Sequence, residues 1–367
     1  MAAEKATAAV DWREDFFDLE SRVYLDCANH GPFPRATVRA VEQALELKKY
    51  PERINNEMYF ELPAQTRAAL ATIVGAKPTE IALTTGATDG TNAVVRGLAW
   101  QPGDEIVLPA NEFPANYYPW KYLEQRGAVV RLVQPADGRF ISADDLLAAV
   151  TEKTRLVAAS LVGYSDSNLL DAARLGAACR ARGVQVFLDA SQAVGVLNLR
   201  VSDLQCDYLT CAGYKWLLCP RGTAFLVLGA EDPTVVPVFA GWYAGEEVWE
   251  SIYGSPLRLA RSARRYDVSP AWFSWMGAVP SLELIASLGV EAIHRHDVSL
   301  ADMTRERLGL PTSQSAIVTI PTDDASALRQ HGIAASVRAG SVRVGFHLYN
   351  DETDVDRLVT ALLPAGR

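Results

Sequence analysis

The sequence predicts an α/β protein with one large domain built on a mostly parallel sheet and a smaller C-terminal α+β domain. Short apolar runs alternate with longer amphipathic stretches from about residue 66 to 230, and this alternation stops after residue 231. A chain of 367 residues also exceeds the usual size of one domain. We therefore expect three parts, which are an N-terminal segment over 1–25, a large domain over 26–255 and a smaller domain over 256–367.

The large domain is expected to alternate strands with helices. Short runs of aliphatic and β-branched residues predict strands at 81–84, 105–108, 129–133, 156–160, 184–188, 208–210 and 224–228. Amphipathic stretches predict helices at 88–98, 115–125, 143–150 and 172–182. Because helices separate these strands, the strands should run mostly parallel and carry helices on both faces.

The last third of the chain has a different pattern. Residues 231–265 are rich in Pro, Gly, Trp and Tyr, which predicts a long loop or lid. A helix is predicted over 271–288, closed by Gly289. Strands at 316–320 and 341–345, followed by a helix at 351–363, complete the predicted smaller domain.

Composition excludes several classes of function. The net charge of −9 and the lack of a dense basic block argue against a nucleic-acid partner. No run reaches the ~18 apolar residues of a membrane span, and the first ten residues do not resemble a signal peptide. Five cysteines at wide spacing, without a CxxC pair, indicate neither a disulfide framework nor a zinc site. We expect a cytoplasmic protein without a metal.

Two motifs place polar groups at the ends of predicted strands. The run 84–88, Thr-Thr-Gly-Ala-Thr, follows a strand and opens a helix, where backbone N–H groups and the helix dipole favour an anion. Asp189 ends a buried strand, at the sheet edge where ligands collect in open parallel sheets. Its carboxylate suits a cationic partner such as a protonated pyridine nitrogen. Each motif alone is also typical of a simple helix cap.

A third motif contains a lysine in apolar surroundings. Lys215 lies in Ala-Gly-Tyr-Lys-Trp-Leu, directly after a predicted strand. Desolvation lowers the pKa of an amine and makes it a better nucleophile towards an aldehyde. An exposed lysine in a turn is the alternative for this motif taken alone.

The order of these three motifs resembles the class V aminotransferase family of pyridoxal-phosphate (PLP) enzymes. This group includes cysteine desulfurases, selenocysteine lyases and isopenicillin N epimerase-like proteins. The resemblance implies PLP-dependent transferase fold type I, a soluble homodimer with shared active sites and an amino-acid substrate. It implies cofactor contacts at Gly86, Ala87, Thr88, Phe113, Asp189, Gln192, Tyr214, Lys215 and Ser269, and substrate contacts at Arg343 and Arg338.

The resemblance also implies a role for each residue. Lys215 is expected to be the Schiff-base lysine and the proton carrier at Cα, and Asp189 to pair with the pyridine nitrogen. Residues 86–88 and Tyr214 are expected to bind the phosphate, and Gln192 to hydrogen-bond the phenolic oxygen. Phe113 is expected to stack on the face of the ring, and Ser269 to bind the phosphate in the partner subunit. Arg343 is expected to hold the substrate carboxylate as a bidentate pair, with Arg338 as a second contact. A plain helix cap is an equal alternative for Ser269.

Departures from the family pattern bear on the reaction. Desulfurases usually have histidine where this chain has Phe113 and Tyr214, and they carry a catalytic cysteine just before the substrate arginine. No cysteine lies between Arg338 and Arg343. We therefore expect a lyase related to desulfurases that works without this cysteine loop.

Several alternatives to this lyase are open. An aminotransferase or an epimerase could use the same scaffold, and a non-catalytic protein could keep the fold. A dinucleotide-binding oxidoreductase is disfavoured because residues 85–90 do not give G-x-G-x-x-G.

Overall fold

The computed structural model describes residues 12–136, 138, 140–229, 234–247, 249–253 and 258–363. Its centre is a seven-stranded sheet in the order β2-β8-β7-β6-β5-β3-β4. The strands are β2 (Ile81–Thr84), β3 (Glu105–Pro109), β4 (Val129–Val133), β5 (Thr154–Ser160), β6 (Gln185–Asp189), β7 (Tyr208–Ala212) and β8 (Ala224–Val227). All neighbouring strands are parallel except β8, which runs antiparallel to β2 and β7. The predicted mostly parallel sheet is confirmed.

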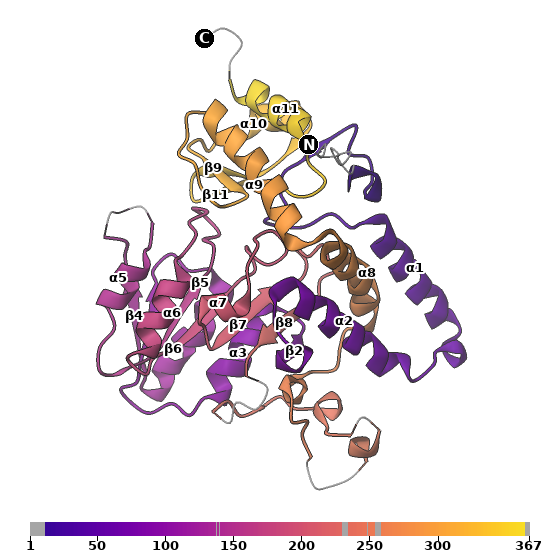
Figure 1. Cartoon of the computed structure of the whole chain (residues 1–367), viewed down its shortest axis with the longest axis vertical. Coiled ribbons are helices and arrows are strands. Elements are labelled where there is room, and N and C mark those ends of the chain that lie inside the picture. The colour runs from indigo at the N-terminus through magenta and orange to yellow at the C-terminus, as the bar shows by residue number, and fades with distance from the viewer. Residues whose placement is uncertain are drawn as a thin grey trace, which may run out of the picture.

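The sheet buries both faces because its strands are apolar on both sides. Val107 of β3 belongs to one core cluster, whereas its neighbours Ile106 and Leu108 belong to another. This alternation follows from the two-residue repeat of a strand. The first cluster includes α5 (Ala143–Ala148) and α6 (Ala172–Arg180), and the second includes α3 (Ala87–Gly97). Helices therefore cover both faces, as Figure 1 shows.

The single helix predicted over 115–125 was wrong. The segment forms three short pieces, which are η4 (Pro114–Asn116), α4 (Tyr118–Lys121) and η5 (Tyr122–Arg126). Pro114 and Pro119 each lie in the first turn of a piece. Proline lacks the N–H that would continue the preceding turn and restricts the residue before it, so a continuous helix is interrupted.

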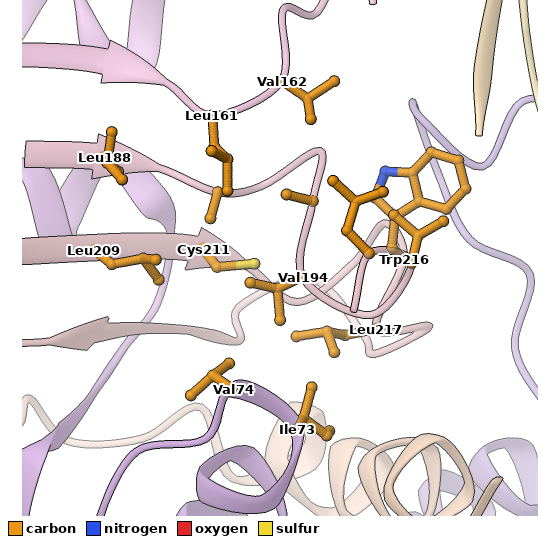
Figure 2. Close-up of a cluster of buried hydrophobic side chains, with 14 of the residues drawn as sticks. Ile73, Val74, Leu161, Val162, Leu188, Val194, Leu209, Cys211, Trp216 and Leu217 are labelled. Atoms are coloured by element: carbon orange, nitrogen blue, oxygen red, sulfur yellow. The ribbon is translucent and has the colours of Figure 1, made fainter. Parts of the chain in front are cut away.

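Three long helices form a layer beside the sheet. They are α1 (Arg35–Lys49), α2 (Met58–Val74) and α8 (Trp272–Leu288), and α8 packs against the other two. Figure 2 shows Ile73 and Val74 of α2 in one apolar cluster with Leu209 of β7 and Leu217. Within the described residues no single helix is long and apolar enough to cross a membrane. Only α8 and the next helix, taken as a pair bent by 83°, reach that length and composition.

A second layer lies beyond the C-terminal ends of the large sheet's strands. Its three antiparallel strands have the order β11-β12-β9 and are β9 (Ile317–Ile320), β11 (Ser336–Arg338) and β12 (Ser341–Gly345). Its helices are α9 (Val290–Arg307), α10 (Ser326–Gln330) and α11 (Glu352–Leu362). The N-terminal strand β1 (Val23–Tyr24) pairs with β10 (Ile333–Ala334) in the same layer. The predicted α+β part is confirmed, and the domain boundaries stay a prediction.

The remaining elements are short. They are α7 (Val201–Leu204), η1 (Trp12–Asp15), η2 (Pro51–Arg53), η3 (Pro78–Glu80), η6 (Trp242–Ala244), η7 (Glu250–Ile252) and η8 (Ala263–Tyr266). The segment between β8 and α8, predicted as a loop, contains only single turns where it is described. In Figure 1 it extends away from the sheet at the end opposite the C-terminal layer.

Candidate active site

Lys215 begins a turn over residues 215–218, called the lysine turn below, in the connection between β7 and β8. Its carbonyl accepts a hydrogen bond from the Leu218 N–H at 3.0 Å, and Leu218 adopts a φ of 56°. This left-handed conformation is strained for a branched side chain and persists where surrounding contacts enforce it. Gly31 provides such a contact, since a Cβ atom there would lie 2.2 Å from the Lys215 carbonyl oxygen. The N-terminal segment therefore fixes the lysine's backbone by close approach.

The side chain of Lys215 is desolvated. It is 7% exposed, and its Nζ lies 5.4 Å from the ring centroid of Phe113 and 5.9 Å from that of Tyr214. Burial lowers the pKa of the amine, and the negative charge of Asp189 opposes this effect while Arg343 adds to it. A lowered pKa increases the fraction of free amine at neutral pH, which suits a nucleophile or a base.

A cavity of about 240 Å³ opens next to Lys215. Its lining includes seven predicted residues, namely Gly86, Ala87, Thr88, Phe113, Asp189, Tyr214 and Lys215. It also includes Thr85, from the predicted 84–88 run, and residues that the sequence analysis did not single out, namely Ala115, Ser191, Ala212, Arg221 and Gly222. Motifs separated by more than a hundred residues therefore meet at one edge of the sheet.

The start of α3 is fixed beside this cavity. Gly86 is the N-cap, and Gly90 packs so closely on β7 that a Cβ atom would lie 2.3 Å from the Thr210 Oγ1. The first N–H groups of a helix lack partners within it, so they can bind an anion in the cavity. The Thr85 hydroxyl donates to the Asp89 carboxylate rather than to the cavity.

Asp189 presents a carboxylate to the same cavity. It ends β6, is 5% exposed, and its Oδ1 accepts a hydrogen bond from the Ser191 N–H at 2.9 Å. No ion pair involves it among the described residues. A buried carboxylate without a cationic partner, a desolvated lysine and a helix N-terminus fit the ring nitrogen, the aldehyde and the phosphate of PLP.

Gln192 and Ser269 do not line this cavity. The buried amide of Gln192 donates from Nε2 to the Ala28 carbonyl and accepts at Oε1 from the Trp216 indole, both at 2.8 Å. Ser269 is exposed and lies just before α8. Their expected contacts with the cofactor stay predictions.

Glu112 anchors the segment that carries Phe113. Its carboxyl group accepts hydrogen bonds from the Ser160 N–H at 2.6 Å, the Phe113 N–H at 2.8 Å and the Ser160 hydroxyl. Burial raises the pKa of Glu112 to about 7, and the charge of Asp189 contributes in the same direction. The Phe113 ring meets Tyr164 edge-to-face at 5.1 Å. Glu112 thus joins the aromatic wall of the cavity to the end of β5.

Arg343 lies next to the cavity but comes from the second sheet. It is 2% exposed, and its Nη1 donates to the Tyr164 carbonyl at 2.7 Å. Its Nη2 lies 3.8 Å from the Asp26 carboxylate, and its Nε has no partner among the described residues. Burial lowers the pKa of Arg343 to about 10. This cation is held in place and keeps a donor for a further acceptor.

Arg338 ends β11 and pairs with Ser341 of β12. Its Nη1 donates to the neighbouring Val337 carbonyl at 2.8 Å. Its charge is the second cause of the lowered Arg343 pKa, so the two arginines influence each other. Arg338 does not line the cavity.

A buried histidine links the second layer to the lysine turn. His347 Nδ1 lies 2.7 Å from the Asp297 carboxylate, and its Nε2 lies 2.9 Å from the Trp216 carbonyl. Both side chains are fully buried. His347 follows Arg343 on the same stretch of chain, but the sequence contains no local signal for its contact with Trp216. This link fixes the peptide directly after Lys215.

Comparison with known proteins agrees with this geometry. Residues 23–328 match the family model described as aminotransferase class-V. Isopenicillin N epimerase of Amycolatopsis lactamdurans is 30% identical, with 97% of this chain and 98% of that protein covered. A cysteine desulfurase of Dickeya dadantii is 28% identical over 81% of this chain and 80% of its own length.

A solved structure of the cystine C–S lyase C-DES with cysteine persulfide has the same fold. It superposes with a TM-score of 0.84 at 24% identity, covering 93% of this chain and 97% of that one. This likeness confirms the expected fold type I.

Proposed function

Because the chain belongs to the class V aminotransferase family of PLP-dependent enzymes, we propose that it breaks a carbon–sulfur bond at Cβ of a small amino acid. The observation that carries this proposal is the cavity beside Lys215, in which a cofactor-type lysine and carboxylate occur without a thiol. Cysteine desulfurase and cystine C–S lyase among the similar proteins support a sulfur-containing substrate.

The proposed roles are those of the family, and the position of each side chain supports them. PLP supplies, when bound, an aldehyde that joins to amines and a ring that accepts electrons from a bond broken at Cα. Lys215 would hold the aldehyde and remove the proton at Cα. Asp189 would keep the ring nitrogen protonated, and the α3 N-terminus with Tyr214 would bind the phosphate. Gln192 would approach the phenolic oxygen by using its second amide N–H.

The substrate's carboxylate is assigned to Arg343. The Tyr164 carbonyl and the Asp26 carboxylate orient the guanidinium, so binding costs less side-chain entropy than it would for a mobile arginine. A carboxylate held there fixes the position of Cα relative to Lys215. Arg338 would add positive charge on the same side.

We propose that no cysteine of this chain accepts sulfur from the substrate. None of the five cysteines, all of which are described, lines the cavity. Burial raises the pKa of every one, to about 11 for Cys179 and about 12 for Cys206. Thiolates are the reactive form, so these cysteines are poor sulfur acceptors. The arrangement favours direct elimination over persulfide relay through a cysteine.

The elimination balances without a further reactant except water. Loss of the proton at Cα and of the sulfur substituent at Cβ leaves 2-aminoacrylate, and water converts this to pyruvate and ammonia. The electron pair of the Cβ–S bond leaves with the sulfur as thiolate or persulfide. No oxidant or reductant is required.

The test is product analysis of the purified protein with PLP and a panel of cysteine, cystine, cysteine sulfoxides and alanine. We expect pyruvate and ammonia in equal amounts with a released sulfur fragment, and no product from alanine. Accumulation of pyridoxamine phosphate that a keto acid reverses would instead establish an aminotransferase.

An epimerase is the second candidate, because the isopenicillin N epimerase match covers nearly the whole of both chains. Loss of optical activity without keto acid or sulfur release would establish this reaction and overturn the lyase. Polarimetry added to the same product panel therefore separates the three reactions.

We also propose a cytoplasmic homodimer. The segment between β8 and α8 exposes Val238, Phe239, Trp242 and Trp249, and Phe60 of α2 packs against the two tryptophans. Exposed apolar groups in such number support a protein interface.

Ser269 is exposed, which would let it reach a partner's cofactor. Five free thiols suit a reducing compartment such as the cytoplasm. Light scattering should give twice the chain mass, and Phe239→Asp should shift it towards the monomer.

A further inference from the structure

Arg221 lines the cavity and has no role in the function proposed above. It lies six residues after Lys215 in the same connection, shortly before β8 begins. Its guanidinium lies over the Tyr214 ring at 4.3 Å from the centroid, and its Nε–H donates to His30 Nε2 at 2.8 Å. Stacking and a hydrogen bond together fix the plane of the guanidinium.

The partner His30 is itself fixed. The Tyr24 hydroxyl donates to the His30 carbonyl at 2.6 Å, and the following Gly31 N–H donates to the Tyr214 carbonyl at 3.0 Å. The rings of His30 and Tyr214 lie 5.3 Å apart. Because His30 accepts at Nε2, it is a neutral ring and does not offset the charge of Arg221.

The two Nη groups of Arg221 are left for a ligand. Neither makes a hydrogen bond or an ion pair among the described residues. Arg221 is the only arginine among the described residues that line the cavity, and it makes no ion pair with Asp189, the carboxylate there. A guanidinium with oriented, unused donors is the arrangement that binds an anion.

We propose that Arg221 binds the phosphate group of the cofactor, an inference that rests on the PLP dependence of the proposed function. Arg221 stacks on Tyr214 and lines the same cavity as Thr85 to Thr88, where the phosphate is expected. The Thr85 hydroxyl is taken by Asp89, so this end of the cavity lacks one donor that the sequence suggests. A guanidinium supplies two parallel donors to a phosphate. The substrate carboxylate has Arg343 instead.

The test is titration of apoenzyme with PLP and, separately, with pyridoxal, which lacks the phosphate. Arg221→Gln should raise the Kd for PLP about 10- to 100-fold and leave the Kd for pyridoxal unchanged, and Arg221→Lys should fall between. The matched control is Arg126→Gln, because Arg126 also stacks on a tyrosine, Tyr122, but lies outside the cavity. The control should bind both compounds like wild type, and circular dichroism checks that each variant is folded.

Two results would overturn the assignment. One is an equal loss of PLP and pyridoxal affinity in Arg221→Gln. The other is equal PLP affinity in Arg221→Gln and wild type, and a raised KM confined to substrates with an anionic side chain would then assign Arg221 to the substrate. A wild-type protein that takes up no PLP would instead contradict the proposed function itself, so the two failures are distinguishable.

Discussion

The two ends of the candidate site are built in different ways. At the cofactor end, the groups follow strands of one sheet. Asp189 ends β6, Lys215 comes shortly after β7, and α3 begins shortly after β2. At the substrate end, Arg343 comes from the second sheet and contacts Tyr164, which is 179 residues earlier in the chain, and Asp26. The first end is assembled by the register of a single sheet, whereas the second depends on how two layers meet.

This difference makes the two ends separable by mutation. The cofactor end is built on the large sheet and the lysine turn, which Gly31 and His347 support from outside, while the substrate end also needs β12 to supply Arg343. Glu112 and His347 connect the ends, because one anchors Phe113 to β5 and the other holds the Trp216 carbonyl from the second layer. Changes at either end should therefore have distinct signatures.

The largest effect is expected at the cofactor end. Lys215→Ala removes the amine that both holds the aldehyde and moves the proton at Cα. Loss of the base alone lowers kcat on the order of 10²–10⁴-fold. Steady-state kinetics and the visible absorbance of the lysine-bound cofactor check this. Lys121→Ala, at a surface ion pair with Glu124, should behave like wild type, and full turnover by Lys215→Ala would remove the basis of the assignment.

The next effect breaks the substrate end alone. Arg343→Gln removes the buried guanidinium, and we expect a loss of about 2–5 kcal/mol in transition-state binding, measured as kcat/KM. PLP affinity should not change, because Arg343 does not line the cofactor cavity. Arg338→Gln is the matched comparison and should cost less. Equal losses from the two variants would show that neither arginine is the specific anchor.

A moderate effect is expected where the ends join. The pKa of Glu112 is raised from 4.5 to about 7 in the folded protein. Its contribution to stability is therefore fully present below about pH 4.5 and is lost as the pH rises through 7. In the wild type, the free energy of unfolding should therefore fall by about 1–3 kcal/mol between pH 4.5 and 8 through this group. Glu112→Gln should abolish this fall, which urea unfolding over the same pH range measures. An unchanged pH dependence in the variant would contradict the raised pKa.

The smallest effect concerns the aromatic wall. Phe113→Leu keeps apolar contact but loses the edge-to-face contact with Tyr164 and the ring beside Lys215. We expect PLP affinity to weaken by about 0.5–1.5 kcal/mol, with kcat/KM reduced by a similar factor. A loss in kcat/KM without a change in PLP affinity would place Phe113 at the substrate end instead.

Much of the cofactor end could be predicted because its signals are local. Asp189 and Lys215 follow apolar runs that fold into neighbouring strands β6 and β7, and the Thr84–Thr88 run opens a helix as expected. A strand end followed by a polar residue is visible in the sequence itself. The sheet then brings these separate strand ends together at one edge.

The rest could not be predicted because it depends on contacts between distant segments. Arg221 resembles any arginine in a turn until the connection folds it over Tyr214. The contact of His347 with Trp216 exists only when the second layer packs on the first. The Gln192 amide bonds with Ala28 and Trp216, partners that a local pattern does not reveal.

The central claim is that Lys215 holds the cofactor independently of the substrate end. Borohydride reduction of the PLP-loaded wild type and of Arg343→Gln, followed by peptide mass mapping, tests it most directly. We predict a pyridoxyl group on Lys215 in both proteins, at equal occupancy. A label on another lysine, or its loss in Arg343→Gln, would contradict the account.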